Sequence, residues 1–299
     1  MVTSYPFPIP EALTNPRLIR QHFARMARVG LEEDLGYGPD LTTLSTISQG
    51  EIGRRVVRSR DAGVLSGLDA VTVLLEVASE PEWNLEGRVE FRPCLNNGDR
   101  VDPGTAVAVL EGDLRVMLQV ERTILNILSH ACGIATHTAQ WVAQMPEGVA
   151  VRDSRKTLPG LRMLQKRAVI HGGGTPHRWA LGDQVMVKDN HVGSSEGGVL
   201  AAYELVKDVP HWVEIEVDTL EQLRQLLQQK PTQILLDNFT VKDTCTAVDM
   251  RDELSPETLL ESSGGITYDS AVMYGATGVD SIAVGALTHS VRVLDLGLD

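Results

Sequence analysis

The stretch WVEIEVDTLEQLRQLLQQKPTQILLDN, residues 212–238, decides the fold class. It begins with a short β-rich run, continues with a helical run over 220–229 whose leucines recur at three- and four-residue spacing, and ends in a second apolar run at 233–236. Strand, helix and strand in this order form a βαβ unit, whose two strands lie parallel. The stretch therefore predicts an α/β fold with a parallel sheet.

The same alternation continues on both sides of this stretch. Further strands are predicted at 149–152, 184–187, 258–261 and 281–284, and further helices at 161–170, 198–207, 242–253 and 269–274. At least six strands in about 140 residues favour a barrel-like sheet over a doubly wound one, and neither G-x-G-x-x-G nor a P-loop motif occurs.

The first part of the chain has a different pattern. A helix is predicted over 12–35, short strands punctuated by glycine over 52–112, a helix near 69–79 and a long helix over 114–145. This order is typical of an α+β unit that precedes the parallel sheet.

Composition narrows the class of partner. The 299 residues are 42% hydrophobic and 22% charged, with a net charge of −13, which argues against nucleic acid or an anionic membrane as a partner. The uncharged run 123–146 is too polar for a membrane span, and no export signal opens the sequence. Cys94, Cys132 and Cys245 lie far apart, so we expect no disulfide framework or cysteine zinc site, and a cytoplasmic location.

Polar residues follow every predicted strand of the parallel sheet. Active sites of parallel barrels lie at the carboxyl ends of the strands, so six such placements in succession predict one shared site. The segments are Asp153-Ser154-Arg155-Lys156, Lys188-Asp189-Asn190-His191, Glu214 and Glu216 with Asp218, Asp237-Asn238, Ser262-Ser263-Gly264-Gly265 and Gly285-Ala286.

A basic segment lies within this acidic chain. Residues 151–191 contain eight Lys or Arg and three Asp, a net charge of +5, which indicates a small, multiply anionic ligand. The cations in loops or at strand ends are the candidates, whereas those on the predicted helix form a solvated face. The candidates are Arg155, Lys156, Arg178 and Lys188, with His177 the histidine best placed for an anion.

Two glycine-bearing loops and two carboxylates indicate a phosphate ligand. The loops at 263–265 and 285–286 stand where barrels commonly hold phosphate on main-chain N–H groups. Glu216 and Asp237 end neighbouring strands and could hold Mg²⁺ bridged to substrate phosphates. The alternative is structural ion pairing of these carboxylates with Lys156 or Lys188.

Short motifs recur along nearly the whole chain. They are the segments 33–36 (EDLG), 121–122 (ER) with Asn126, 154–162 (SRKTLPGLR), 172–174 (GGG) with His177-Arg178, 187–191 (VKDNH), 214–217 (EIEV), 236–238 (LDN), 261–266 (ESSGGI), 278–281 (GVDS) and 284–289 (VGALTH). Together, and in this order, they resemble the quinolinate phosphoribosyltransferase (decarboxylating) family.

The resemblance implies an architecture and an assembly. Residues 1–123 would form an amino-terminal α/β sandwich, to which 289–299 return, and 124–288 an incomplete, seven-stranded α/β barrel. It also implies a homodimer whose sites are shared between subunits, and a higher assembly stays open.

The resemblance also implies the reaction. The phosphoribosyl group of 5-phosphoribosyl-1-pyrophosphate would be transferred to quinolinate with Mg²⁺, giving nicotinate mononucleotide, pyrophosphate and CO₂, a step of NAD biosynthesis. The implied quinolinate contacts are Arg122 (from the other subunit), Arg155, His177, Arg178 and Lys188. The implied contacts of the donor are Ser154, Lys156, Glu216, Asp237, Ser263, Gly264, Gly265, Val284, Gly285 and Ala286. Lys156, Glu216 and Asp237 are the implied catalytic residues, with Glu216 and Asp237 near the metal, directly or through the substrate.

Two positions depart from the family pattern. Threonine commonly stands where this chain has Ser154 and Leu158, so a hydrogen bond is put in doubt at Leu158 only. Two other functions fit the same motifs: a transferase for another pyridine or azole acid, and a non-catalytic sensor of the phosphoribosyl donor.

Overall fold

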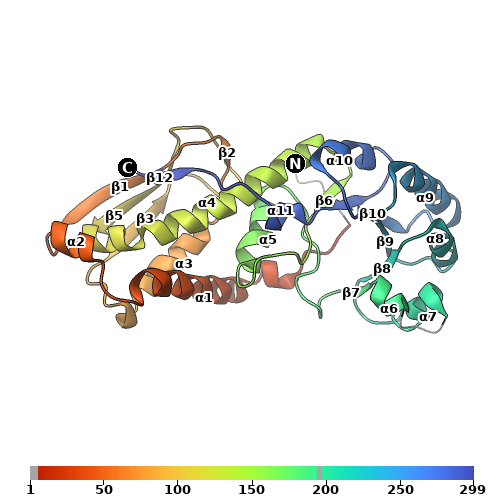
Figure 1. Cartoon of the computed structure of the whole chain (residues 1–299), viewed down its shortest axis with the longest axis horizontal. Coiled ribbons are helices and arrows are strands. Elements are labelled where there is room, and N and C mark those ends of the chain that lie inside the picture. Colours follow the sequence, from red (N-terminus) through yellow and green to blue (C-terminus); the bar gives the residue numbers. More distant parts are fainter. Residues whose placement is uncertain (1–5, 194–196) are drawn as a thin grey trace. The chain divides into compact units, whose positions relative to one another are not determined.

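A computed structural model describes residues 6–193 and 197–299 (Figure 1). The chain forms two compact units that interleave along the sequence. The parallel-sheet unit contains the residues up to Pro10, 140–156 and 174–286, and the antiparallel-sheet unit contains 11–139, 157–173 and 287–299. No helix among the described residues is both long enough and apolar enough to cross a membrane.

The parallel-sheet unit confirms the predicted α/β class. Its strands are β6 (Ala150–Arg152), β7 (Val185–Val187), β8 (Val213–Val217), β9 (Gln233–Asp237), β10 (Leu259–Ser263) and β11 (Ser281–Ala283). They pair in the order β6-β11-β10-β9-β8-β7, and each of the six begins and ends within two residues of its predicted range. All five residues of β8 are buried, as in a sheet covered on both faces.

The seventh strand of the expected barrel is reduced to a bridge of one residue. Thr175 forms a single parallel bridge with Arg152 and donates its N–H to the Val151 carbonyl oxygen at 2.8 Å. Pro176 follows and has no N–H to continue a ladder. The described residues therefore form a six-stranded sheet with an additional bridge at its β6 edge.

Threonines begin three of the helices that follow strands. Thr219, Thr240 and Thr267 each accept a hydrogen bond from the main-chain N–H three residues later. The helices of this unit are α6 (Asp189–Gly193), α7 (Gly198–Glu204), α8 (Leu220–Leu227), α9 (Val241–Leu254) and α10 (Tyr268–Gly275), and α11 (Ala286–His289) begins at the last residue of the unit. These caps fix the chain directly after the carboxyl ends of β8, β9 and β10.

The antiparallel-sheet unit is built around β1 (Ile52–Ser59), β3 (Val89–Pro93), β5 (Ala106–Asp113) and β12 (Leu296–Leu298), which pair in the order β12-β1-β5-β3. A two-stranded ladder joins β2 (Gly63–Val64) to β4 (Arg100–Val101). The helices are η1 (Glu11–Leu13), α1 (Pro16–Leu35), α2 (Leu41–Thr46), α3 (Leu68–Ala78), η2 (Pro81–Trp83), α4 (Leu114–Gln144) and α5 (Arg162–His171). The helices predicted near 12–35, 69–79, 114–145 and 161–170 are confirmed, whereas α2 was not predicted. The solvated cationic face expected on the helix at 161–170 is wrong, because Lys166 is fully buried and Arg162 and Arg167 are half-buried.

Candidate active site

The predicted polar segments do lie at the carboxyl ends of the parallel strands. Strand register places Asp237 opposite Ser263, and Glu216 opposite Leu235 on the neighbouring strand. The segments that follow β6, β7, β8, β9, β10 and β11 therefore share one edge of the sheet. This carboxyl edge carries every candidate residue except Arg122, which is exposed on α4 in the antiparallel-sheet unit.

Three carboxylates gather at the ends of β8 and β9. Glu216, Asp218 and Asp237 each offer an oxygen, and these oxygens lie within 4.8 Å of one another. Burial raises the pKa of Asp237, and the neighbouring Glu216 carboxylate raises it further. Burial and Glu216 likewise raise the pKa of Asp218. Like charges held together in this way favour a bound cation.

Lys188 offsets part of this negative charge. Its Nζ lies 2.9 Å from Glu216 Oε2, and the N–H of Asp189 donates to Glu216 Oε1 at 3.4 Å. The ion pair between Lys188 and Glu216 is the structural alternative that the sequence left open. Asp218 and Asp237 leave an excess of negative charge beside this pair.

Two guanidinium groups belong to the same edge. Arg155 and Lys156 are exposed directly after β6, where the N–H of Lys156 donates to Ser154 Oγ at 3.1 Å. Arg178 is only 8% exposed. Burial lowers the pKa of Arg178, and the charge of Arg155 lowers it further, against the opposing influence of Glu214 and Asp183. Arg155 and Arg178 thus offer one anion two guanidinium groups, each able to form a pair of hydrogen bonds with it.

His177 lies deeper than the two arginines. It is 4% exposed, and its Nε2 lies 2.9 Å from Glu214 Oε2 and 3.4 Å from Glu261 Oε1. Its Nδ1 accepts the main-chain N–H of Arg178 at 2.8 Å. Both ring nitrogens therefore lie against groups inside the protein. Burial acts to lower the pKa of His177, but the carboxylates of Glu214 and Glu261 outweigh burial and raise it.

A buried polar network lies behind His177. Arg152 and Glu261 are at most 1% exposed, with Arg152 Nη1 2.5 Å from Glu261 Oε2, and the Arg152 guanidinium lies 4.2 Å from the centre of the Phe7 ring. Gln233 Nε2 donates to Glu214 Oε1 at 2.8 Å, and Ser281 Oγ donates to Glu261 Oε2 at 2.8 Å. The inward-facing polar side chains of β6, β8, β9, β10 and β11 thereby form one connected cluster.

The two predicted phosphate loops have different backbone constraints. Gly264 has φ +86°, and a Cβ there would lie 2.2 Å from Asn238 Oδ1, so only glycine fits. Gly265 has φ +61° and open space at its Cβ position. Val284 is buried and donates its N–H to the Arg152 carbonyl oxygen at 2.8 Å, which places Gly285 and Ala286 at the start of α11.

Sequence reasoning gave no role to three carboxylates with defined positions here: Asp153 and Asp218, which it placed in the polar segments, and Asp183, which it did not name. Asp218 joins Glu216 and Asp237, and the alternation of Glu214, Glu216 and Asp218 on one face was its signal. Asp153 and Asp183 accept main-chain N–H groups of the segment that carries Arg178. Their only signal was proximity to the basic residues, which does not distinguish a ligand contact from an internal one.

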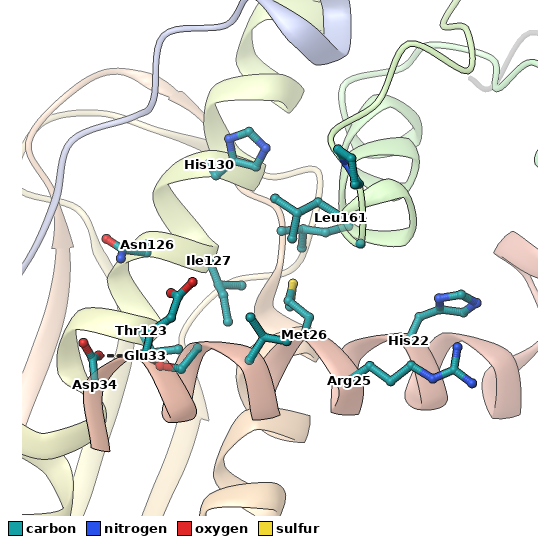
Figure 2. Close-up of a pocket in the computed structure, with 15 residues that line it drawn as sticks. His22, Arg25, Met26, Glu33, Asp34, Thr123, Asn126, Ile127, His130 and Leu161 are labelled. Atoms are coloured by element: carbon teal, nitrogen blue, oxygen red, sulfur yellow. Dashed lines mark hydrogen bonds between the residues drawn. The ribbon is translucent and has the colours of Figure 1, made fainter. Parts of the chain in front are cut away.

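A cavity of about 510 Å³ lies in the antiparallel-sheet unit (Figure 2). The motif residues Glu33, Asp34 and Asn126 line it together with apolar side chains of α1 and α4 and with Leu161. Thr123 Oγ1 donates to Asp34 Oδ2 at 3.0 Å. Residues of the motif at 33–36, together with Asn126, thus line this cavity and are not part of the carboxyl edge.

Comparison with known protein families covers both units. Residues 40–132 match the family described as quinolinate phosphoribosyl transferase, N-terminal domain, and residues 134–299 match its C-terminal domain.

Curated relatives and solved structures agree with the family matches. The chain is 46% identical over 278 residues to the nicotinate-nucleotide pyrophosphorylase [carboxylating] of Mycobacterium leprae, a match that covers 91% of this chain and 95% of that protein. It is 35% identical to the probable enzyme of that name from Methanocaldococcus jannaschii, over 94% of this chain and 98% of that protein. The structure of the nicotinate-nucleotide pyrophosphorylase from Francisella tularensis superposes with a TM-score of 0.85 at 31% identity, over 94% of this chain and 96% of that one.

Proposed function

The chain belongs to the quinolinate phosphoribosyltransferase family, and from this premise we propose that it transfers the phosphoribosyl group of 5-phosphoribosyl-1-pyrophosphate to quinolinate. Loss of CO₂ then gives nicotinate mononucleotide, and pyrophosphate is released, a step of NAD biosynthesis. The observation that carries the proposal is that two guanidinium groups and a cluster of carboxylates lie on the same edge of the sheet. A diacid and a metal-bound diphosphate require these two environments side by side.

The pyridine diacid is held by cations. Arg155 and Arg178 form charge-assisted hydrogen bonds with its carboxylates, and Lys188 contributes a third positive charge. Arg122 of a second subunit completes this set. His177 lies directly behind Arg178, with its ring nitrogens turned to Glu214 and to the Arg178 N–H.

The phosphoribosyl donor is held beside the diacid. Glu216 and Asp237 meet its ribose hydroxyls, Ser154 and Lys156 meet its diphosphate, and the main-chain N–H groups of 263–265 and 284–286 meet its phosphate. Glu216 and Asp237, together with Asp218, would hold Mg²⁺, which neutralises the charge of the leaving pyrophosphate when it is bound. The three carboxylates fit this ion: their oxygens lie within 4.8 Å of one another, and burial, followed by repulsion from Glu216, raises the pKa of Asp237.

Catalysis depends on orientation and charge. Departure of pyrophosphate leaves an oxocarbenium-like ribosyl centre, so the cations orient the pyridine nitrogen toward it and Lys156 stabilises the leaving group. No enzyme nucleophile is needed. The ribosylated ring nitrogen is cationic and stabilises the carbanion left at the adjacent carbon when its carboxylate departs as CO₂, and that carbon then takes up a proton from solvent to give nicotinate mononucleotide.

A turnover assay tests this function. Purified protein given carboxyl-labelled quinolinate, the phosphoribosyl donor and Mg²⁺ should release labelled CO₂. Turnover of nicotinate but not of quinolinate would replace the proposal with a transferase for a monoacid. Donor binding without turnover of either acid would replace it with a sensor of the donor.

We extend the proposal to a cytoplasmic homodimer. Free thiols at Cys94, Cys132 and Cys245 support the location. If the sites are shared, mixing the impaired Arg122→Ala and Arg155→Ala proteins should give more activity than either protein alone, because one site of each mixed dimer contains both arginines. Random reassortment would restore about a quarter of the wild-type rate. A dimer by light scattering without any restoration would refute sharing.

A further inference from the structure

The segment that carries Arg178 is irregular, yet its main chain is fully anchored. Residues 175–180 form neither helix nor strand beyond the bridge at Thr175. Each N–H in this segment nevertheless has an acceptor, and Pro176 has none to donate. The acceptors are Val151 O for Thr175 (2.8 Å), Asp153 Oδ1 for His177 (2.7 Å), His177 Nδ1 for Arg178 (2.8 Å), Asp183 Oδ2 for Trp179 (2.6 Å) and Asp183 Oδ1 for Ala180 (2.9 Å).

Asp183 has a special place among these acceptors, because it binds two consecutive N–H groups, one with each carboxylate oxygen. These N–H groups directly follow Arg178. The negative charge of Asp183 also favours the charged form of Arg178, whose pKa is lowered by burial and by Arg155. One carboxylate therefore fixes the backbone next to Arg178 and offsets part of the repulsion that Arg178 experiences.

The guanidinium of Arg178 has limited anchoring of its own. Its Nη1 donates to the Gln184 carbonyl oxygen at 3.3 Å, a long contact. Arginine side chains have high rotamer entropy, and repulsion from Arg155 would favour other rotamers. Position and aim of the side chain consequently depend on the main chain from which it projects.

We propose that Asp183 is a positioning residue for quinolinate: it holds the main chain at Trp179 and Ala180 and thereby aims Arg178 at a carboxylate of the diacid. This inference rests on the proposed function, specifically on the role of Arg178. Asp183 touches neither substrate. It acts by reducing the conformational freedom that Arg178 would otherwise lose on binding.

A double-mutant cycle in the full-length protein tests this role. Asp183→Ala should raise the quinolinate KM about five- to tenfold, with kcat and the donor KM little changed. Asp183→Asn keeps one acceptor oxygen and should give a smaller increase. In Arg178→Ala protein, adding Asp183→Ala should raise the quinolinate KM no further, because the group that Asp183 positions is already absent.

Asp280 provides a matched control at the opposite edge of the sheet. Its Oδ2 accepts the Leu260 N–H at 2.8 Å and lies 3.0 Å from Arg251 Nη1, so it too combines a main-chain contact with an arginine. Asp280→Ala should lower the unfolding temperature and leave the quinolinate KM unchanged. If Asp183→Ala does not fold, the cycle is carried out with Asp183→Asn.

The outcomes distinguish the role of Arg178 from that of Asp183. An unchanged quinolinate KM in Arg178→Ala protein would refute the proposed role of Arg178. A raised KM in that protein with a normal KM in both Asp183 variants would overturn only the positioning role. Additive effects in the double variant, or equal effects of Asp183→Ala and Asp280→Ala on the quinolinate KM, would also overturn it.

Discussion

The interior of the parallel sheet and its carboxyl edge are both charged, but their charges are arranged in opposite ways. In the interior, Arg152 pairs with Glu261 Oε2, which also accepts a hydrogen bond from Ser281, and the two oxygens of Glu214 accept hydrogen bonds from Gln184 and Gln233. At the edge, Arg155 stands near Arg178, and Glu216 stands near Asp237. The interior charges have opposite partners within the protein, whereas the edge keeps like charges side by side next to the Lys188–Glu216 pair, and under the proposed function the ligands would supply the missing opposite charges.

The largest effect is expected from breaking the interior pair. Arg152→Ala leaves Glu261 buried without its cation and should lower the free energy of unfolding by about 3–5 kcal/mol. Urea denaturation followed by circular dichroism measures the change. Arg152→Met with Glu261→Leu should recover much of the loss, because the buried charges are removed together. A loss below about 1 kcal/mol in the single variant would show that the interior is not matched in this way.

Acid should weaken the same pair. Burial would raise the pKa of Glu261, but Arg152 and then His177 outweigh it and lower the pKa from 4.5 to about 2. A carboxyl whose pKa is lower in the folded state contributes stability that is complete above its ordinary pKa and lost as pH falls through the folded value. The unfolding free energy should therefore decrease between about pH 5 and pH 2. In Glu261→Gln protein this part of the decrease should be absent, and an unchanged pH profile in that variant would contradict it.

The sequence predicted the strands and their shared carboxyl edge, but not which charged side chains belong to the interior and which to the edge. Apolar runs such as 213–217 show where strands lie, and a parallel sheet then forces their carboxyl ends onto one edge. The sequence could not show that Glu214 faces inward to Gln184, Gln233 and His177 while Glu216 pairs with Lys188, because both carboxylates have the same spacing and type. Side-chain partners from distant strands decide that difference.

Removing a cation from the carboxyl edge should weaken the use of quinolinate without lowering the free energy of unfolding. Arg155→Ala removes a charge-assisted contact worth about 1.5–3 kcal/mol and should lower kcat/KM for quinolinate at least about tenfold. Because Arg155 is exposed and near Arg178, the free energy of unfolding should stay the same or rise slightly. Arg224→Ala, at an exposed position of α8, makes the same charge change and should leave both quantities unaltered. Unchanged steady-state constants for Arg155→Ala would remove it from the site.

The smallest effect is expected in the Tm of Asp237→Asn, and it tests directly whether like charges at the carboxyl edge destabilise the fold. Burial and Glu216 raise the pKa of Asp237, so its ionised form at neutral pH costs the folded state some stability. Asp237→Asn removes that cost and should raise Tm by about 1–2 °C, a small gain because solvent screens a half-exposed group. Turnover should fall sharply in the same protein, because the proposed contact of Asp237 to the phosphoribosyl donor and to Mg²⁺ would be lost. Asp243→Asn, in the first turn of α9, removes a charge that the helix dipole favours and should lower Tm or leave it unchanged.

With the phosphoribosyl donor and Mg²⁺ present, the wild-type protein should have a higher Tm than Asp237→Asn, since the wild-type protein gains more from binding. A lower Tm for Asp237→Asn without ligands would mean that this carboxylate serves the fold, and the distinction between interior and edge would not hold there.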